Sequence, residues 1–305
     1  MQSVHKTVLL QESIDGLNIT GDGSGQSIVD ATFGGGGHSV LLCTRYPKLK
    51  VIALDQDKTA FLKAKDKFEN VKTDIKFINS NFRDLDKVLA KEGVEQINGI
   101  LFDLGLSSDQ LENSLRGFSF MKDEPLHMTM KDNPSREDLT AYDILNTWSE
   151  ENLATIIYGY GEERFSRRIA KAIVDARQKA DFNTTFDLVR VIEGAVPGAY
   201  KRGRIHCATK TFQALRIAVN DELQALGDGL EKGFQFLEQG GRMAVISFHS
   251  LEDRIVKRFF KNKEKEGKLI LINDSVIGLH RRAIMLVELL KRAGFFYHHF
   301  QSFGH

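Results

Sequence analysis

The stretch Ser27-Ile-Val-Asp-Ala-Thr-Phe-Gly-Gly-Gly-Gly-His38 decides the fold. Its first part, residues 27–33, is mostly apolar and follows a turn-rich segment over 21–25, so we predict a buried strand there. Four glycines come next, and they allow positive φ angles and a close approach of the backbone to a ligand. A helix that begins after them offers free N–H groups at its positive end. The stretch therefore predicts a strand–turn–helix unit that holds a ligand at the turn.

Three further apolar runs follow within the first hundred residues or so. Residues 51–54, 75–78 and 99–104 each have the length and composition of a short buried strand. Asp57 is a suitable N-cap for a helix between two of them, with apolar positions on one face at Ala60, Phe61, Ala64 and Phe68. Strands that alternate with helices form right-handed βαβ units and a parallel sheet. We therefore predict an α/β protein with a doubly wound, mostly parallel sheet.

This alternation stops between residues 107 and 207, where no run predicts a buried strand. Amphipathic helices replace it, the clearest over 163–179, and a further helix is expected from about Ala208 to Leu226. Strand patterns return at 240–248 and 268–272. The sequence thus predicts one sheet domain in two parts, residues 1–106 and 208–305, interrupted by an all-helical domain over 107–207.

Composition excludes several classes of protein. Of the 305 residues, 42% are hydrophobic and 27% charged, which is typical of a soluble globular protein. The two cysteines, Cys43 and Cys207, lie far apart and fit neither a disulfide scaffold nor a structural zinc site. No apolar run reaches the roughly 18 residues of a membrane span, and the N-terminus lacks the core of a signal peptide. We expect a soluble, cytoplasmic protein.

Carboxylates at the ends of predicted strands suit a nucleoside cofactor. Asp55 ends the second strand, where a carboxylate can accept hydrogen bonds from both hydroxyls of a ribose. The glycine turn lacks the Gly-x-Gly-x-x-Gly spacing that favours a pyrophosphate, because His38 follows the fourth glycine. This spacing favours S-adenosylmethionine, which has no phosphate, over a nicotinamide dinucleotide. Asp30 and Asp103 are candidates for its amino-acid end, and Phe82 for the adenine.

Six blocks of the sequence carry a resemblance to one family. They are DATFGGGGHS from Asp30, DLGLSSDQL from Asp103, RGFSFMKD from Arg116, YGEERFSRRIAKAIV from Tyr160, ATKTFQALRIAVNDEL from Ala208 and GGRMAVISFHSLEDRIVKRFF from Gly240. In this order, within residues 5 to about 260, the chain resembles the RsmH (formerly MraW) family of 16S ribosomal RNA cytosine-N4 methyltransferases.

The resemblance implies a class I, Rossmann-like methyltransferase fold with an inserted helical domain that helps to recognise RNA. It implies N4-methylation of a cytidine in the decoding (P-site) region of 16S rRNA, with the small ribosomal subunit as partner. Carried over by position, the family's contacts to S-adenosylmethionine fall on Gly36, Gly37, His38, Asp55, Phe82, Asp103 and Gln110. Of these, His38 and Gln110 come from the resemblance alone.

Two residues are candidates for the chemical step. The exocyclic amine of cytosine is a poor nucleophile, because its lone pair is delocalised into the ring. Asp103, at the end of the fourth predicted strand, is placed to accept a hydrogen bond from it. His249 is a candidate to take up the departing proton, since histidine titrates near neutral pH. This segment could instead be only a strand-to-helix turn with Ser250 as its N-cap. No metal is expected.

Contacts to RNA are expected from the middle of the chain. The net charge is only +1, but basic residues gather between residues 164 and 210. Phosphate contacts are predicted for Lys201, Arg202, Arg204 and Lys210. Phe118, Phe120 and Phe248 are candidates to stack on an extruded base, although such aromatics more often belong to a core.

Two features depart from the family's pattern. In the loop over 122–131, Glu124 stands for a glycine, His127 and Lys131 for acids, and Thr129 for an arginine. Residues 273–305 form an atypical tail in place of a basic segment. With these departures, a non-catalytic family member that binds the cofactor or the ribosome stays an alternative hypothesis. The sequence also leaves room for a nicotinamide-dependent oxidoreductase or a small-molecule methyltransferase. The oligomeric state is open, with a homodimer among the options.

Overall fold

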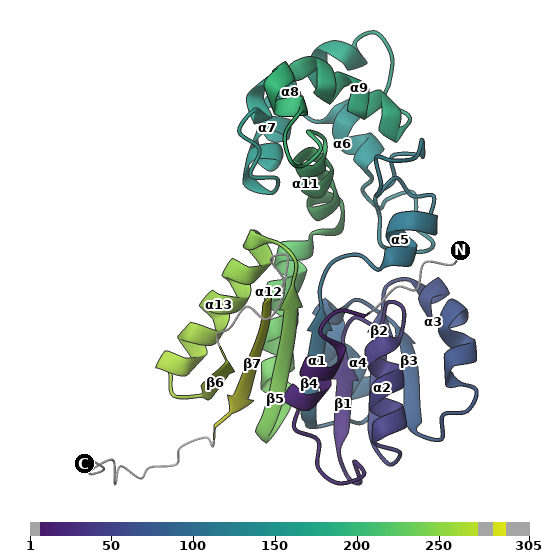
Figure 1. Cartoon of the computed structure of the whole chain (residues 1–305), viewed down its shortest axis with the longest axis vertical. Coiled ribbons are helices and arrows are strands. Elements are labelled where there is room, and N and C mark those ends of the chain that lie inside the picture. The colour runs from purple at the N-terminus through teal and green to yellow at the C-terminus, as the bar shows by residue number, and fades with distance from the viewer. Residues whose placement is uncertain (1–6, 274–282, 291–305) are drawn as a thin grey trace.

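The structure, a computed structural model, describes residues 7–273 and 283–290. Figure 1 shows a sheet with helices on both faces and a helical region above it, beyond the ends of the strands. The strands are β1 Ser27–Asp30, β2 Lys50–Asp55, β3 Asp74–Asn79, β4 Ile97–Asp103, β5 Leu237–Ser247, β6 Leu269–Asn273 and β7 Ala283–Leu289.

The sheet positions the site through the order of its strands, β3-β2-β1-β4-β5-β7-β6. The strands β1 to β5 run parallel, and β7 is antiparallel to both β5 and β6. The strand order reverses direction at β1, which pairs with β2 on one side and β4 on the other. Ligands of doubly wound sheets bind beyond the carboxyl ends of the strands at this point. The predicted sheet is confirmed.

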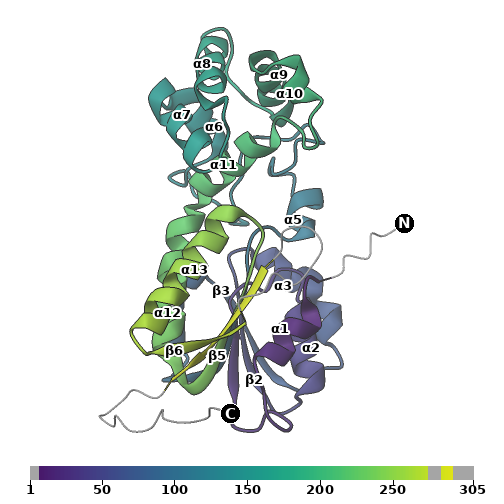
Figure 2. The same ribbon diagram turned by 60° about the vertical axis from the view of Figure 1, so that its left-hand side comes forward.

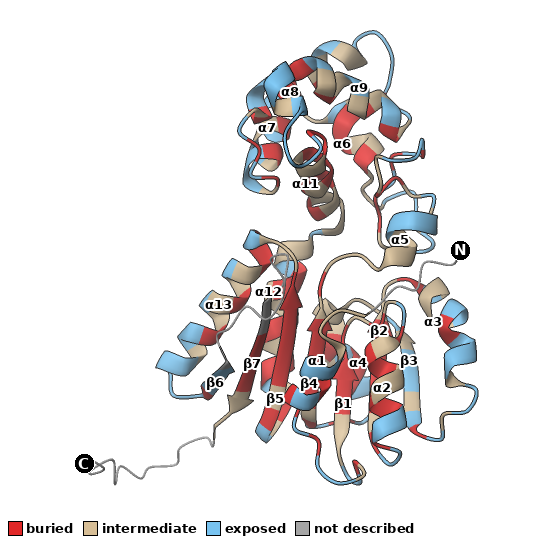
Figure 3. Cartoon of the chain, in the orientation of Figure 1, coloured by how far each residue is buried: buried red, intermediate tan, exposed pale blue. Residues whose placement is uncertain are grey.

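Successive residues of the strands face opposite sides of the sheet and enter two separate cores. Val29, Ile52 and Phe102 pack against α4 (Leu85–Lys91), α12 (Glu222–Phe236) and α13 (Ser250–Lys265). Ile28 and Val51 pack against α1 (Leu10–Gly16) and α2 (Gly37–Arg45). Figure 2 shows these two helical layers on either side of the sheet, and Figure 3 shows its buried strands between them. Short elements complete this part: α3 Lys58–Ala64, η1 Lys65–Phe68 and η2 Phe82–Asp84.

Between β4 and α12 the chain, which is described throughout this stretch, forms no strand beyond one isolated bridge of Pro125 to Thr184. Its helices are α5 Ser108–Asn113, α6 Ala141–Thr147, α7 Glu150–Gly159, α8 Ser166–Arg177, α9 Thr185–Ala195, α10 Gly198–Lys201 and α11 Thr209–Asn220. The core of this helical region includes Phe212 and Leu215 of α11. It therefore extends past residue 207, where we expected the insertion to end.

Three helix and strand boundaries differ from the prediction. The helix expected over 208–226 breaks at Asp221, whose φ of 49° ends α11 and begins α12. The helix expected from Glu163 begins at Ser166, because the Glu163 carboxylate accepts the backbone N–H of Phe165 before the first turn. The first strand ends at Asp30 and not at Phe33.

The atypical tail contributes to the sheet. Residues 283–289, which we did not predict as a strand, form β7 between β5 and β6. Met285 and Val287 of β7 lie in the same core as Phe102. The rest of the tail, 274–282 and 291–305, lies outside the described residues. Among the helices that the structure describes, none has the length and apolar character needed to cross a bilayer.

The place of β7 leads to a prediction about stability. Met285 is 2% exposed and packs in the core, so Met285→Ala should lower the free energy of unfolding by about 2–5 kcal/mol. Guanidinium unfolding followed by circular dichroism measures this. Ile272 in β6 is 39% exposed and supplies the matched control, because Ile272→Ala should cost less. Equal stabilities of Met285→Ala and wild type would show that 283–289 does not pack in the sheet.

Candidate active site

A cavity of about 510 Å³ lies at the carboxyl ends of β1, β2 and β4, within the roughly 300–1,000 Å³ common for small-molecule sites. Its walls come from the sheet, from the helical region and from the segment that precedes α1. Predicted site residues on the wall are Gly37, His38, Asp55, Phe82, Asp103, Gln110 and Phe248. The wall also includes Thr7, Val8, Gly34, Gly35, Met130, Asn220, Glu222 and Glu252.

The glycine turn makes a backbone cradle at this cavity. Gly34 and Gly36 have φ angles of 51° and 76°, which other residues rarely adopt. A Cβ atom on Gly35 would meet nothing within 4 Å, so its backbone is open to a ligand. Gly36 is turned away and faces the ring of Phe33, and it does not line the cavity. A Cβ on Gly37 would lie 2.0 Å from Oγ1 of Thr7, so the N-terminal segment packs directly on the start of α2.

Asp55 is held at the end of β2 by two backbone donors. The N–H of Gly34 donates to its Oδ2 at 2.7 Å, and the N–H of Asp57 donates to its Oδ1 at 2.8 Å. Burial raises the pKa of Asp55 to about 6, although both hydrogen bonds lower it. The carboxylate is therefore fixed, ionised at neutral pH and faces the cavity, which suits the ribose of a nucleoside cofactor.

His38 and Asp103 lie together at the centre of the wall. Nδ1 of His38 is 3.7 Å from Oδ2 of Asp103, and Oγ1 of Thr32 accepts the backbone N–H of Asp103. Burial lowers the pKa of His38 to about 4, against a hydrogen bond with the backbone of Val8 that raises it. The imidazole is therefore neutral at pH 7, and its contact with Asp103 is not an ion pair.

Phe82 and Gln110 both line the cavity. The ring of Phe82 also packs edge-on against Phe102, with the centroids 5.6 Å apart. Gln110 forms a capping box with Ser107 at the start of α5, where each side chain accepts the other's backbone N–H. The capping box fixes the position of Gln110 beside the cavity.

His249 does not line the cavity. It is itself the N-cap of α13, the position that we considered for Ser250. Its Nδ1 accepts the N–H of Glu252 at 3.4 Å, and its Nε2 lies 3.2 Å from Oε1 of Glu252. Both ring nitrogens thus face Glu252, so the role of His249 as proton acceptor stays a prediction that requires the ring to turn.

Sequence reasoning missed four carboxylates of the wall, Asp57, Asp109, Glu222 and Glu252. Burial raises the pKa of Glu252, but hydrogen bonds from His249 and from the backbone of Phe248, together with Arg216, outweigh it and hold the pKa below its usual value. Glu222 accepts two hydrogen bonds from Arg216, each 2.8 Å long. The helix break at Asp221 brings Glu222 to the cavity, and a sequence pattern that favours one continuous helix gives no sign of it.

Of the residues predicted to contact RNA, Phe248 lines the cavity and the others lie outside it. Phe118 is buried in the helical core, and Phe120 is stacked on His206 with the ring centroids 4.7 Å apart. Phe118 is thus covered by protein, whereas Phe120 is half-buried. Lys210 donates to the backbone oxygen of Glu162. By contrast, Lys201, Arg202 and Arg204 are exposed on the helical region.

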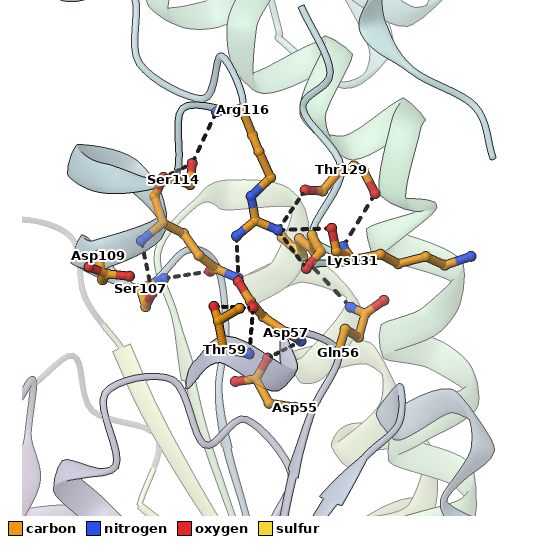
Figure 4. Close-up of polar contacts among 12 residues, drawn as sticks. Asp55, Gln56, Asp57, Thr59, Ser107, Asp109, Ser114, Arg116, Thr129 and Lys131 are labelled. Atoms are coloured by element: carbon orange, nitrogen blue, oxygen red, sulfur yellow. Dashed lines mark hydrogen bonds and ion pairs between the residues drawn. The ribbon is translucent and has the colours of Figure 1, made fainter. Parts of the chain in front are cut away.

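The altered loop over 122–131 sits beside the cavity, and Met130 is its residue on the wall. Glu124 is buried and accepts the N–H of Gly117, while the Lys131 ammonium pairs with Asp138. Arg116 binds backbone oxygens of residues 129–131 and the carboxylate of Asp57, as Figure 4 shows. The replaced side chains Glu124, His127, Thr129 and Lys131 therefore do not line the cavity.

The strand order with its antiparallel β7, the glycine cradle and the carboxylate after β2 define the class I S-adenosylmethionine-dependent methyltransferases. Within this class, the sequence model of the MraW methylase family matches residues 2–276, so the chain belongs to that family. It is an enzyme that uses S-adenosylmethionine, and this membership rules out a nicotinamide-dependent oxidoreductase. The match ends near the start of the tail that we found atypical.

Similar proteins are known by sequence and by structure. The chain is 46% identical to the ribosomal RNA small subunit methyltransferase H of Persephonella marina over 241 residues, which are 79% of this chain and 81% of that protein. An rRNA methylase of Streptococcus thermophilus is 12% identical with a TM-score of 0.46, over 94% of this chain and 98% of the other. A Streptococcus mutans protein solved in complex with SAH is 14% identical with a TM-score of 0.47, over 94% and 100%.

The titration of Asp55 predicts how the affinity for S-adenosylmethionine depends on pH. The free carboxyl group has a raised pKa of about 6, and donors from the ribose favour its ionised form. Binding therefore releases a proton below pH 6, and the affinity should rise with pH and level off above it. At pH 5 the dissociation constant, measured by calorimetry, should be about tenfold larger than at pH 7.

Asp55→Asn should weaken binding at pH 7 by about 1.5–3 kcal/mol and remove most of this pH dependence. The matched control is Asp30→Asn, because Asp30 also has a pKa raised to about 6 by burial but bonds to Ser39 and does not line the cavity. A pH dependence that survives in Asp55→Asn and disappears in Asp30→Asn would place the titrating group at Asp30.

Proposed function

We propose that the protein methylates N4 of a cytidine in the decoding region of 16S rRNA within the small ribosomal subunit, in the cytoplasm. The observation that carries the proposal is the 46% identity to a small subunit rRNA methyltransferase H over four fifths of both chains. The six sequence blocks support the finer assignment to N4 of cytidine. A homodimer stays a prediction.

The chain's own residues support transfer to an amine at this cavity. S-adenosylmethionine supplies an electrophilic methyl group on a positively charged sulfur. Asp55 and the backbone of Gly34 and Gly35 hold the nucleoside part, which leaves Asp103 for the reacting end. A carboxylate at Asp103 accepts a hydrogen bond from the N4 amine and helps its lone pair to localise on nitrogen. Orientation of the two substrates in one cavity supplies much of the remaining acceleration.

The departing proton needs a route from the cavity to water. The carboxylates that line the wall on the side of β5 and α12 are Glu222 and Glu252. Glu252 is held ionised and fully engaged by His249 and two backbone donors, so it serves to fix the wall. We assign the first acceptance of the proton to Asp103, with His249 as a later acceptor once its ring has turned.

A basic surface on the helical region suits the phosphates of a folded RNA. Arg164, Arg167 and Arg168 project from the start of α8 and the turn before it, and all three are exposed. The exposed Lys201, Arg202 and Arg204 add to the positive charge of this region. Phosphate contacts of this kind position an RNA without reading its sequence. The base itself must leave the stack to enter the cavity, where Phe248 on the wall is the ring that we expect to stack on it.

Labelled S-adenosylmethionine and small subunits that lack the N4 methyl group test the proposed function. After digestion of the RNA, we expect the label in N4-methylated cytidine at one position. Small subunits that already carry the methyl group are the control and should take up no label. Label in another nucleoside, or none while the cofactor still binds, would refute the proposed reaction.

Asp103→Ala separates chemistry from binding. Loss of the hydrogen-bond acceptor should lower kcat by about 100-fold or more, while the dissociation constant of S-adenosylmethionine changes by less than about tenfold. Asp74→Ala is the control, since Asp74 is exposed and begins its strand, β3, whereas Asp103 ends β4, so the two lie at opposite ends of the strands. Equal losses of kcat and of cofactor affinity would assign Asp103 to binding and not to the chemical step.

A further inference from the structure

Arg116 connects two walls of the cavity through a buried guanidinium. It comes from the loop after α5, in the helical region, and its side chain is 13% exposed. One terminal nitrogen, Nη2, pairs with Oδ2 of Asp57, whose side chain is 4% exposed. The other, Nη1, donates to the backbone oxygens of Thr129, Met130 and Lys131 at 3.3, 3.1 and 2.9 Å. Figure 4 shows the guanidinium between these two sets of acceptors.

On the Asp57 side, the contact lies close to Asp55, the carboxylate proposed to hold the ribose of the cofactor. The backbone N–H of Asp57 donates to Oδ1 of Asp55, and the Asp57 side chain caps α3 by accepting the N–H of Thr59 at 3.0 Å. A shift of Asp57 therefore shifts a donor to Asp55. The ionised pair is buried, so neither partner can readily exchange the other for water.

On the other side, the contact holds a loop that carries a wall residue. Met130 lines the cavity, and its backbone N–H donates to Oδ1 of Asn220 at 2.7 Å. Its sulfur lies 3.8 Å from Nε2 of Gln56, the residue between Asp55 and Asp57. The loop over 128–131 is thus fixed to the β2–α3 turn of the sheet part through Arg116 and Gln56, and to the end of α11 through Asn220.

We propose that Arg116 is a positioning residue that couples occupation of the cofactor site to the placement of the loop over 128–131. A ribose bound to Asp55 holds the turn that bears Asp57 in place. Asp57 in turn holds the guanidinium, and the guanidinium holds the three backbone carbonyls of residues 129–131. Occupation of the cofactor site therefore steadies a cavity wall that is already formed on the side of the helical region. This inference rests on the proposed contact of Asp55 with the ribose, but not on the identity of the RNA.

Hydrogen exchange of the full chain, with and without S-adenosylmethionine, tests the coupling without RNA. In wild type, the cofactor should slow exchange in two peptides, one over the β2–α3 turn and one over 128–131, the latter by about tenfold. In Arg116→Lys, which keeps the charge but cannot reach both sets of acceptors, only the first peptide should gain protection. Its dissociation constant for S-adenosylmethionine should stay within about threefold of wild type.

Arg190→Lys is the matched control, since Arg190 pairs with Asp187 on the exposed face of α9 and should behave like wild type. Should Arg116→Lys fail to fold, Asp57→Asn measures the same coupling, because asparagine keeps the helix cap but loses the ion pair. The proposal is overturned if the cofactor protects residues 128–131 in either variant as much as in wild type. It is also overturned if the cofactor gives these residues no protection in wild type. If wild type shows the coupling but does not methylate small subunits, the proposed function fails and this inference stands.

Discussion

The hydrogen-bond register between β1 and its two parallel neighbours is the constraint on which the rest of the structure depends. It pairs Asp30 with Ala53 of β2 on one side and with Leu101 of β4 on the other, so the carboxyl ends of the three strands lie next to one another. The glycine turn, Asp55 and Asp103 each follow or end one of these strands, and they meet because the strands do. A one-residue slip of any strand would turn its buried side chains to the other face of the sheet.

Most of the sheet could be predicted from sequence, because short apolar runs bounded by turn residues carry a local signal. That Asp55 and Asp103 lie together at the cavity could also be predicted, from their place at strand ends. The helix break at Asp221 could not be predicted, since the apolar spacing continues through it and a tertiary ion pair of Arg216 with Glu222 spans it. β7 was missed because its apolar run stands in a segment without family resemblance.

Two neighbouring aspartates illustrate how context assigns roles that residue type does not. Asp55 ends β2, Asp57 follows two residues on, and both line the cavity. Yet the Asp55 carboxylate accepts two backbone N–H groups, whereas the Asp57 carboxylate pairs with Arg116. The partner of Asp57 lies 59 positions away in the chain, inside the inserted region. Contacts of this range are set by how the insertion folds back over the sheet, and no spacing in a single sequence encodes them. His249, by contrast, takes its role from a local partner, because it forms the capping box of α13 with Glu252, three residues further along the chain.

The packing of Thr7 on Gly37 has a practical consequence for the way this enzyme is handled. Thr7 and Val8 belong to the cavity wall, and the backbone of Val8 contacts His38, so the first described residues of the chain are part of the candidate site. A purification tag fused ahead of Met1 would therefore lie only a few residues from the pocket in the chain. Affinities measured on such a fusion would report the tag together with the enzyme, unless the added residues are first removed by a protease.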